Sequence, residues 1–353
     1  MIISYEQDLR LIRTLLHAYG LSGSDAACVA EVVRHSDFTG VYSHGLSRLI
    51  LYIRQLENGS MNAAAEVETI SDEGAVIRLE CHNGSGIVAV NHAYDVLLEK
   101  ARTYGIAIAT GMHSGNIGCG AFYGCRAARD NMIGIVCCNT LPSMAPFGGA
   151  EPLIGTNPII VGVPAGAEHP IVLDISTSGV AMGKIQSARR EGKAIPLGWA
   201  TDVDGRPTTD PDKACAVLPI AGHKGYGLAV IVDVLSAVLA DAAYGFHTGG
   251  NDLLTAEDTG FCIILIDPSH FMPIPDFTAR VDDYIRMVKS SRPAAGVPEI
   301  FLPGEIEFRK LEQLRKNGLP VTEAVEKELC LYAAKRGLIP AGGSFAELLA
   351  VCL

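Results

Sequence analysis

The spacing of apolar and polar positions predicts a helical beginning for this chain. Over residues 6–19, 24–38 and 46–56, apolar side chains recur every three or four positions, as on one face of an amphipathic helix. Ser24 is placed to cap the second of these helices, and Gly59 follows the third where a helix commonly ends. The first 60 residues are therefore predicted to be helical.

The middle of the chain has the pattern of a sheet. Short apolar runs bounded by turn residues predict strands at residues 75–79, 106–109, 133–138, 159–163, 171–173 and 260–266. Helical stretches at residues 90–104 and 121–130 separate several of these runs. Strands that alternate with helices predict an α/β protein with a largely or partly parallel sheet and crossover helices.

Two further segments complete the prediction. Residues 195–211 are rich in Pro, Gly and Asp and are predicted to be a long surface excursion, followed by an apolar helix at residues 226–241. From residue 276 onward the pattern is again charged and helical, and we expect this tail to pack back on the N-terminal helices. The chain contains no internal repeat and no low-complexity tract.

Composition narrows the class of protein. The 353 residues suffice for one large or two ordinary domains, and 48% hydrophobic residues with 38 Gly are typical of a compact α/β protein. Lys and Arg number 28 against 39 Asp and Glu, which gives a formal net charge of −11. This is the wrong sign for contact with a phosphate backbone, so no nucleic-acid partner is expected.

Cysteine usage and hydropathy bear on location. The ten cysteines follow no regular framework and form no C-x-x-C pair, so we expect buried thiols, a reducing compartment and no metal site. The N-terminus carries acidic residues where a signal peptide would be basic, and the most apolar segment, residues 228–243, is interrupted by Asp233 and Asp241. We therefore expect a cytoplasmic protein with no membrane association.

The segment around His44 is the first candidate for chemistry. Ser43 and His44 open the third predicted helix, and Arg48 stands one turn beyond His44 on the same face. A helix N-terminus disfavours imidazolium, so His44 could exchange a proton near neutrality while Arg48 binds a substrate carboxylate. The alternative is structural: Ser43 caps the helix, His44 lies on its shoulder and Arg48 is solvated.

A glycine-rich turn is the second candidate. Residues 105–120 have the order strand, glycine-rich turn and helix N-terminus, which can bind a pyrophosphate. The glycine order is G-x-x-G-x-G, however, and the next strand ends near Thr140 with no acid for a ribose hydroxyl. The segment therefore fails as a Rossmann fingerprint, and a turn that lets the helix pack close to its strand explains it equally well.

Other polar groups lie at the ends of predicted elements. Thr156 and Asn157 occupy a tight loop and could offer donors to a small ligand, whereas Asp174 and Ser176 follow a strand and could bind ribose or cap a helix. Residues 222–225, which contain His223 and Lys224, directly precede the apolar helix, where a lysine and backbone amides suit a phosphate. The basic run at residues 184–193 is expected to be a solvated helix face.

These segments, taken in order, resemble one family: the malate/L-lactate dehydrogenases that are unrelated to the Rossmann-type lactate dehydrogenases. The resemblance covers nearly the whole chain. It rests on Ser43-His44-Gly45 with Arg48, Ala145-Pro-Phe-Gly-Gly149, Gly155-Thr-Asn-Pro158, Asp174 with Ser176 and Ser178, Gly183-Lys184, Ile195-Pro196 with Gly198-Trp199-Ala200, Pro207-Thr-Thr-Asp-Pro211 and Gly222-His-Lys-Gly-Tyr-Gly-Leu228. Members include malate, sulfolactate and ureidoglycolate dehydrogenases, 2,3-diketogulonate reductase and piperideine-2-carboxylate reductase.

The resemblance implies a particular architecture. It implies an α/β fold with a family-specific mixed-sheet cofactor domain, which is not a standard Rossmann fold, flanked by helical N- and C-terminal regions. On this basis residues 1–75 form a helical region with the catalytic segment and residues 76–270 the NAD(P)-binding domain. Residues 271–353 form a helical region that packs back on the first. The protein is expected to be a homodimer with its active site near the subunit interface.

The resemblance also implies roles for individual residues. His44 would be the proton donor, with Ser43 and Lys184 orienting or tuning it, and Arg48 and Thr156 would bind the substrate. The cofactor, NAD or NADP, would contact residues from several segments: Asn116, Ile117, Gly118, Cys119, Gly120, Thr140, Asp174, Ile175, Ser176, His223, Lys224, Gly304, Glu305 and Ile306.

The chemistry agrees with the residues, with one departure from the family pattern. Reduction of a 2-oxo acid needs a proton donor and a cation that fixes the carboxylate, and His44 and Arg48 supply these. Many members carry a histidine where this chain has Asn116, which cannot transfer a proton at neutral pH. Either His44 acts alone, or His113, three residues earlier, takes part beside the substrate.

We therefore expect an NAD(P)-dependent dehydrogenase acting on a small 2-hydroxy or 2-oxo acid. A reductase of a cyclic imine acid is an alternative, because protonation of an imine nitrogen uses the same groups. A nucleotide-binding protein without turnover is another, and it predicts NADH binding without substrate-dependent oxidation. A non-redox lyase would leave Lys224 and the glycine-rich turn without a role.

Overall fold

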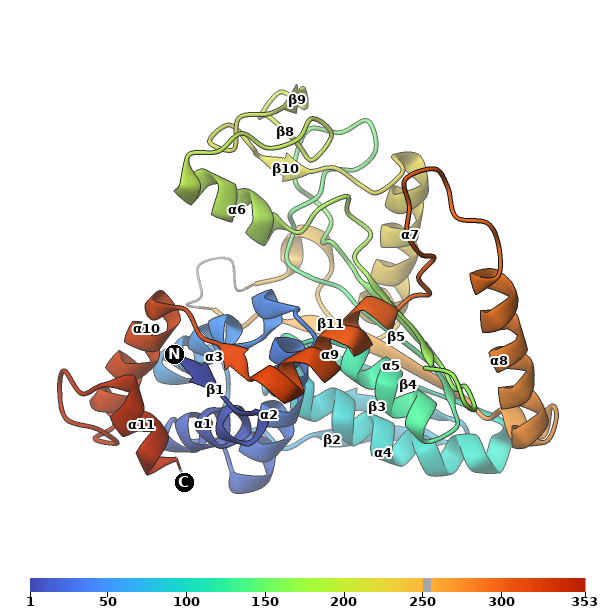
Figure 1. Ribbon diagram of the computed structural model, residues 1–353, viewed down its shortest axis with the longest axis horizontal. Coiled ribbons are helices and arrows are strands. Elements are labelled where there is room, and N and C mark those ends of the chain that lie inside the picture. The colour runs from blue at the N-terminus through green and yellow to red at the C-terminus, as the bar shows by residue number, and fades with distance from the viewer. Residues whose placement is uncertain (250–254, 353) are drawn as a thin grey trace.

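Three amphipathic helices begin the chain, as the apolar periodicity predicts. In the computed structural model, which describes residues 1–249 and 255–352, they are α1 (Tyr5–Ala18), α2 (Gly23–Phe38) and α3 (Leu46–Asn58) (Figure 1). Gly59 ends α3 with a φ of 80°, which glycine adopts without strain. The predicted cap of α2 is wrong: Ser22 accepts a hydrogen bond from the Asp25 N–H, because the helix starts at Gly23 and Ser24 already lies inside its first turn.

The C-terminal helices close back on these three. α9 (Glu305–Asn317), α10 (Glu323–Lys335) and α11 (Phe345–Val351) share one apolar core with α1 to α3, and β1 (Ile2–Ile3) pairs with β12 (Leu319–Pro320). α8 (Ile274–Lys289) instead lies at the opposite end of the molecule (Figure 1). There the Asp282 carboxylate accepts hydrogen bonds from backbone N–H groups of residues 166–168.

A mixed sheet forms the centre of the molecule. Among the described residues it has seven strands, in the order β2 (Glu68–Glu73), β3 (Val76–Glu80), β4 (Ile106–Ser114), β11 (Thr259–Ile266), β5 (Ile133–Cys138), β6 (Ile159–Val163) and β7 (Ile171–Ile175). Only β3 and β4 pair in parallel. The expectation of a partly parallel sheet is confirmed and that of a largely parallel one is wrong, because five of its six strand pairings are antiparallel, two of them made by β11.

Both faces of the sheet are covered. α4 (Gly86–Tyr104) and α5 (Gly120–Arg129) pack on the face that presents Phe261, Ile263 and Leu265 of β11. α7 (His223–Asp233) continues as a π-helix, η2 (Val234–Val238), and this pair covers the face that presents Cys262 and Ile264. Successive β11 side chains thus point to opposite apolar layers, and the strand is buried on both sides.

A small lobe, the upper lobe of residues 144–155 and 178–222, stands on the sheet domain above the N-terminal helices (Figure 1). It contains α6 (Met182–Glu191) and a sheet of β8 (Ala200–Thr201), β9 (Pro207–Thr208) and β10 (Ala216–Val217). The prediction of a plain surface excursion is wrong, because Ile195, Ala200 and Val217 are buried in a core of their own with Met144 and Ile185. The short 3-10 turns are η1 (Tyr42–His44), η3 (Gly245–His247) and η4 (Pro268–His270).

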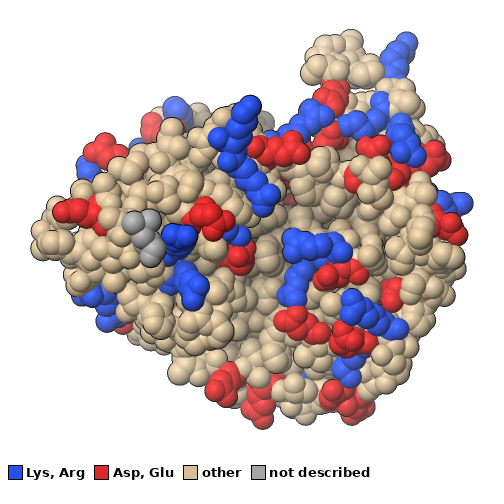
Figure 2. Space-filling model, turned by 60° about the horizontal axis from the view of Figure 1, so that its bottom comes forward, with Lys and Arg blue, Asp and Glu red and all other residues tan. Residues whose placement is uncertain are grey.

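The distribution of surface charge and the apolar character of the helices bear on the expectations about nucleic acid and membranes. On the face shown in Figure 2, acidic and basic side chains are interspersed and no continuous basic tract is seen. Within the described residues, no helix combines the length and the apolar character needed to cross a membrane.

α5 and β6 can pack closely because they meet at two glycines, Gly124 and Gly162. A Cβ on Gly162 would lie 2.1 Å from the carbonyl oxygen of Gly124. We expect Gly162→Ala to lower the free energy of unfolding by about 1–3 kcal/mol through overpacking. Denaturant unfolding measures the change. Gly23→Ala is the matched control, since a Cβ there meets nothing within 4 Å, and an equal loss in both variants would contradict the packing argument.

Candidate active site

His44 lies in a turn before α3 rather than in the helix. The 3-10 turn Tyr42–His44 ends at Gly45, whose φ of −91° and ψ of −142° are not helical, and α3 begins at Leu46. The prediction that Ser43 and His44 open the third helix is therefore wrong by one turn. The Ser43 Oγ is 3.0 Å from Nδ1 of His44. Nε2 has no hydrogen-bond partner among the described residues and is the ring nitrogen left for a ligand.

The surroundings of His44 favour its neutral form. Burial, and secondly the charge of Arg48, lower its pKa from 6.5 to about 4. The side chain nevertheless remains within reach of solvent. His44 therefore titrates below the neutral range expected from its position, and at pH 7 it is a base that can accept a proton.

Arg48 begins a polar stripe on α3. Arg48, Tyr52 and Gln55 are spaced by four and three residues, which places them on one face of the helix. The Nε of Arg48 is buried without a hydrogen-bond partner in the described part of the chain. A buried guanidinium nitrogen that no protein acceptor satisfies is suited to an anionic ligand. This supports the expected substrate-binding place of Arg48.

Tyr52 fixes the orientation of Asn116. The Tyr52 hydroxyl donates to Oδ1 of Asn116 at 2.7 Å, and the Gly118 N–H donates to the same oxygen at 3.0 Å. Because Oδ1 accepts both bonds, the Nδ2 amide of Asn116 is left as a donor. Burial raises the pKa of Tyr52, although the nearby Arg48 opposes this, so the phenol keeps its proton.

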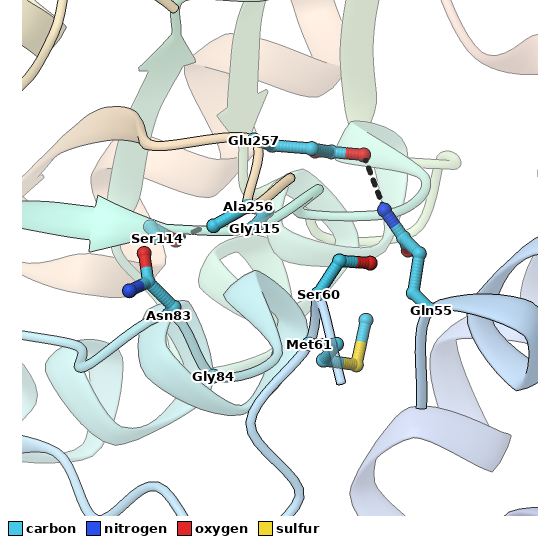
Figure 3. A pocket seen from close by; sticks show the side chains of 9 residues that line it. All are labelled: Gln55, Ser60, Met61, Asn83, Gly84, Ser114, Gly115, Ala256 and Glu257. Carbon is cyan, nitrogen blue, oxygen red and sulfur yellow. Dashed lines mark hydrogen bonds between the residues drawn. The ribbon is translucent and has the colours of Figure 1, made fainter. Parts of the chain in front are cut away.

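A small cavity continues the stripe toward the start of β11 (Figure 3). Gln55 Nε2 donates to Glu257 Oε1 at 3.0 Å across this cavity, and the charge of Glu257 also faces Tyr52. The remaining lining residues come from four segments: Ser60, Met61, Asn83, Gly84, Ser114, Gly115 and Ala256. Sequence reasoning missed Tyr52, Gln55 and Glu257. The polar spacing along an otherwise apolar helix could have indicated the first two, whereas nothing local indicates Glu257.

His113 lies in a different environment from His44. It has a φ of 47°, and its Nδ1 is 2.6 Å from Oε2 of Glu80 on the neighbouring strand. The hydrogen bond to Glu80, with smaller contributions from Asp258, raises the pKa of His113 against its partial burial. The carboxylates thus favour the protonated form of His113, and no described contact joins it to His44 or Arg48.

The glycine-rich turn serves close packing. Ile117 and Cys119 are buried, and a Cβ on Gly118 would lie 2.9 Å from side-chain atoms of Ile87 and Val32. The contacts show that the turn packs closely against α2 and α4. The side chains of Ile117 and Cys119 are consequently part of the apolar cores of the protein.

The amino end of α5 is already occupied. Asp174, at the end of β7, accepts a hydrogen bond from the Ala121 N–H at 2.7 Å, while Gly120 packs against Ile160. Partial removal from water by the surrounding protein raises the pKa of Asp174 to about 6, although solvent still reaches the side chain. One backbone N–H of this helix terminus is therefore already bound by the carboxylate of Asp174.

Three polar residues meet at the ends of β5 and β6. The Thr156 N–H donates to Thr140 Oγ1 at 2.9 Å, and the Thr140 N–H donates to Asn157 Oδ1 at 3.0 Å. A Cβ on Gly155 would lie 2.2 Å from the Thr140 carbonyl oxygen, so the loop requires glycine there. The structure thus brings the predicted Thr140 and Thr156 together in one cluster.

The upper lobe and the start of α7 carry the other predicted residues. Lys184 is exposed on α6, and no described contact links it to His44 within this chain. His223 and Lys224 are exposed in the first turn of α7, whose amino end has no side-chain cap. Next to Ile175, Ser176 Oγ lies 3.2 Å from Ser178 Oγ.

The turn at Gly304 runs beside the edge of the sheet. The Val172 N–H donates to the Pro303 carbonyl at 3.0 Å, and Gly304 has a φ of 89° against Val172. Burial alone would raise the pKa of Glu305, but hydrogen bonds from Lys289, the Leu302 N–H and Arg309 hold it below its usual range. The Glu305 side chain is therefore engaged, whereas Ile306 is exposed.

The described residues contain no cluster of His, Cys, Asp or Glu suited to a metal ion. All ten cysteines lie in the described part of the chain, and each is a free thiol. The groups that could act on a ligand are therefore His44, Arg48 and their neighbours, with the exposed cations of α7.

Comparison with known proteins gives consistent results. A family model described as malate/L-lactate dehydrogenase matches residues 3–330. L-sulfolactate dehydrogenase of Methanocaldococcus jannaschii is 36% identical over 94% of this chain and 96% of its own. Ureidoglycolate dehydrogenase (NAD(+)) of Escherichia coli O157:H7 is 32% identical over 93% and 95%, and (2R)-3-sulfolactate dehydrogenase (NADP(+)) of Chromohalobacter salexigens is 33% identical over 95% and 99%.

Solved structures match at the level of the whole fold. The sulfolactate dehydrogenase of Methanocaldococcus jannaschii superposes with a TM-score of 0.90, at 34% identity and over 96% of this chain and 98% of its own. The delta1-piperideine-2-carboxylate reductase of Pseudomonas syringae superposes with a TM-score of 0.86, at 29% identity and over 94% and 100%. The expected mixed-sheet fold is confirmed.

The depressed pKa of His44 is directly measurable. We expect the His44 ring in protein labelled with 13C-histidine to stay neutral until about pH 4, well below the usual 6.5. NMR titration follows the signal, which His44→Gln identifies by its disappearance. A midpoint near 6.5 would contradict the buried environment.

The lowered pKa of His44 also predicts how the free energy of unfolding changes with pH. Between pH 6.5 and about 4 the unfolded chain binds a proton at His44 and the folded chain does not. Stability from this group is present above pH 6.5 and is lost as the pH falls toward 4. Wild type should therefore lose more free energy of unfolding on acidification than His44→Gln.

Proposed function

The chain belongs to the malate/L-lactate dehydrogenase family, and from this premise we propose that it is an NAD(P)-dependent oxidoreductase that interconverts a small 2-hydroxy acid and its 2-oxo acid. One observation carries the proposal. A neutral His44 with a free Nε2 lies within the electrostatic reach of Arg48, whose buried Nε has no protein acceptor among the described residues. A base beside a guanidinium whose Nε is unsatisfied is an arrangement that suits a 2-hydroxy acid.

Arg48 and Asn116 bind the acid in this proposal. The guanidinium binds the carboxylate, and the Asn116 Nδ2 donates to the oxygen on the adjacent carbon. Tyr52 holds the Asn116 amide in that orientation. Thr156, from the Thr140 cluster, contributes a further donor to the substrate.

His44 moves the proton. In the oxidation direction the neutral ring accepts the proton of the 2-hydroxyl group at Nε2, and Ser43 at Nδ1 fixes the ring. In reduction, a carboxylate on Arg48 offsets the charge that helps to depress the pKa of His44. The ring then gains a proton more readily and gives it to the carbonyl oxygen. Lys184 tunes this exchange from the upper lobe or from a partner subunit.

The exposed groups of α7 and β7 fit a dinucleotide. The uncapped amino end of α7, with His223 and Lys224, suits a phosphate. Oδ1 of Asp174 accepts no hydrogen bond among the described residues and suits a ribose hydroxyl, beside Ser176. When bound, the nicotinamide coenzyme accepts or supplies the hydride. The other assigned contacts, residues 116–120, Thr140 and the turn Gly304–Ile306, would be made largely through the backbone.

A reductase of a cyclic imine acid is the second candidate. Its support is the TM-score of 0.86 with a piperideine-2-carboxylate reductase. The same His44 would protonate an imine nitrogen, and the same Arg48 would bind the carboxylate. A nucleotide-binding protein without turnover leaves the unsatisfied Arg48 Nε unexplained.

We also propose a homodimer, located in the cytoplasm as the ten free thiols suggest. α7, η2 and the residue that follows them expose large apolar side chains on the side away from the sheet: Leu228, Ile231, Val234, Val238 and Leu239. A continuous apolar face of this kind is typical of a subunit interface. Because α7 begins with His223 and Lys224, this interface would put the active site close to the partner subunit.

The proton role of His44 is tested with a substrate panel. NADH and NADPH oxidation at 340 nm is measured with 2-oxo acids and cyclic imine acids. We expect His44→Gln to lower kcat by about 10²- to 10⁴-fold, as for loss of a general acid–base group. The panel also identifies the coenzyme and the substrate class.

Variants of two other histidines serve as the control and as the test of an alternative proton donor. His92→Gln, on the exposed side of α4, is the matched control and should retain wild-type kcat. A loss in His113→Gln together with survival of activity in His44→Gln would transfer the proton role to His113. Coenzyme binding without turnover across the panel would contradict the proposed dehydrogenase.

The dimer is tested by charge insertion. Ile231 is 57% exposed on α7, and Ile231→Glu should convert the dimer to a monomer, since a buried unpaired carboxylate is costly at an interface. Light scattering after size-exclusion chromatography measures the mass. Val203→Glu, at a 76% exposed position in the upper lobe, is the control. A monomeric wild-type protein would rule the dimer out.

A further inference from the structure

Residues at the C-terminal end of α2 form hydrogen bonds with both ends of the segment 41–46, which contains His44. The Ser36 hydroxyl donates to the Val41 carbonyl at 2.7 Å, and the Val41 N–H donates to the Ser36 carbonyl at 2.9 Å. On the other side, Asp37 Oδ2 accepts a hydrogen bond from the Leu46 N–H at 2.8 Å. Ser43 and His44 lie between these two attachments.

Asp37 takes the place of a missing helix cap. The residue before α3 is Gly45, which has no side chain to accept hydrogen bonds from the first turn of the helix. Asp37 is 3% exposed and supplies a carboxylate from another helix to this end of α3. A carboxylate oxygen there also suits the positive end of the helix dipole.

The fit between Asp37 and Gly45 is close. A Cβ on Gly45 would lie 1.8 Å from Asp37 Oδ1 and 2.2 Å from its Cγ. The carboxyl group therefore fills the space that any other residue at position 45 would need. Gly45 is also the residue at which the His44 turn changes direction into α3.

We propose that Asp37 is a positioning residue that sets the His44 turn relative to Arg48 by capping α3 from the neighbouring helix. The inference rests on the proposed function, because it takes His44 as the group that exchanges the proton. Asp37 itself touches neither the substrate nor the coenzyme. Its effect reaches the reaction through the geometry of the turn.

A second buried carboxyl group stands behind Asp37. Asp8 is fully buried, and neither of its oxygens has a hydrogen-bond partner in the described structure. Burial and the mutual repulsion of Asp8 and Asp37 raise the pKa of Asp37, while burial, opposed by Arg34, raises the pKa of Asp8 to about 7. The Leu46 N–H needs only an acceptor oxygen at this place, which the side-chain amide of an asparagine also supplies.

Two variants of Asp37 should therefore differ in kcat. Asp37→Ala removes the acceptor, and we expect kcat to fall by about 10- to 100-fold, the effect of a small misplacement of a catalytic group. KM for the acid should change by less than about threefold, since Arg48 stays on α3. Asp37→Asn keeps an oxygen for the Leu46 N–H, and its kcat should stay within about threefold of wild type.

A control separates positioning from loss of a helix cap. Ser344 caps α11 with its own exposed hydroxyl, which accepts from the Glu347 N–H at 3.3 Å. Ser344→Ala should lower the melting temperature without changing kcat. Wild-type kcat in Asp37→Ala, or equal losses in Asp37→Ala and Asp37→Asn, would overturn the proposed capping role.

An activity-independent measurement distinguishes the two proposals. In 13C-histidine-labelled Asp37→Ala, the His44 signal should move and titrate at a higher pH than in wild type, as the turn opens to solvent. An unchanged His44 titration would overturn the role of Asp37 whatever the enzyme does. If His44→Gln retains full activity, the proposed function fails, but this titration still tests Asp37.

A double-mutant cycle tests the contact with Gly45. Gly45→Ala should lower kcat by about tenfold by pushing against the Asp37 carboxyl group. In the Asp37→Ala background the same change should have little further effect, because the space is then open. Fully additive losses would contradict the proposed contact.

Discussion

The insertion of β11 into the middle of the sheet is the constraint on which the rest of the structure depends. This strand pairs antiparallel with β4 on one side and with β5 on the other, and it joins the β2–β4 half of the sheet to the β5–β7 half. Its register sets Thr259 opposite Ser114. The segments next to these residues, with Glu257 and Asn116, are thereby brought to the same end of the central strands, where α3 presents Tyr52 and Gln55 to them.

Elements with a local cause were predictable from the sequence, and those with a distant partner were not. The predicted bounds of β5 and β6 agree with the structure residue for residue, since each is an apolar run between turns. β2 was missed because its residues are polar and mostly exposed at the sheet edge. The place of β11 depends on pairing across more than 120 residues of sequence, which no local pattern encodes.

The residues of the candidate site also fall into those that local sequence indicates and those that only the packing of two helices reveals. Ser43, His44 and Arg48 stand close in the sequence, and their spacing by itself indicates chemistry. Asp37 has no such signal, because in the sequence it is a polar residue near the end of a helix. Its contact with Leu46 arises only when α2 and α3 pack, and nine residues separate the two partners.

Asn116 determines how protons can move in this site. Its amide is fixed by Tyr52 and by the Gly118 N–H, so it can donate a hydrogen bond to a substrate but cannot carry a proton. Burial raises the pKa of Tyr52 and keeps that phenol protonated, and a guanidinium such as that of Arg48 stays charged. Among these described residues, His44 is the one to which the proposed function assigns the exchange of a proton. In that proposal the reaction depends on the position of His44, and the backbone on either side of the His44 turn is bound by Ser36 and Asp37 of α2.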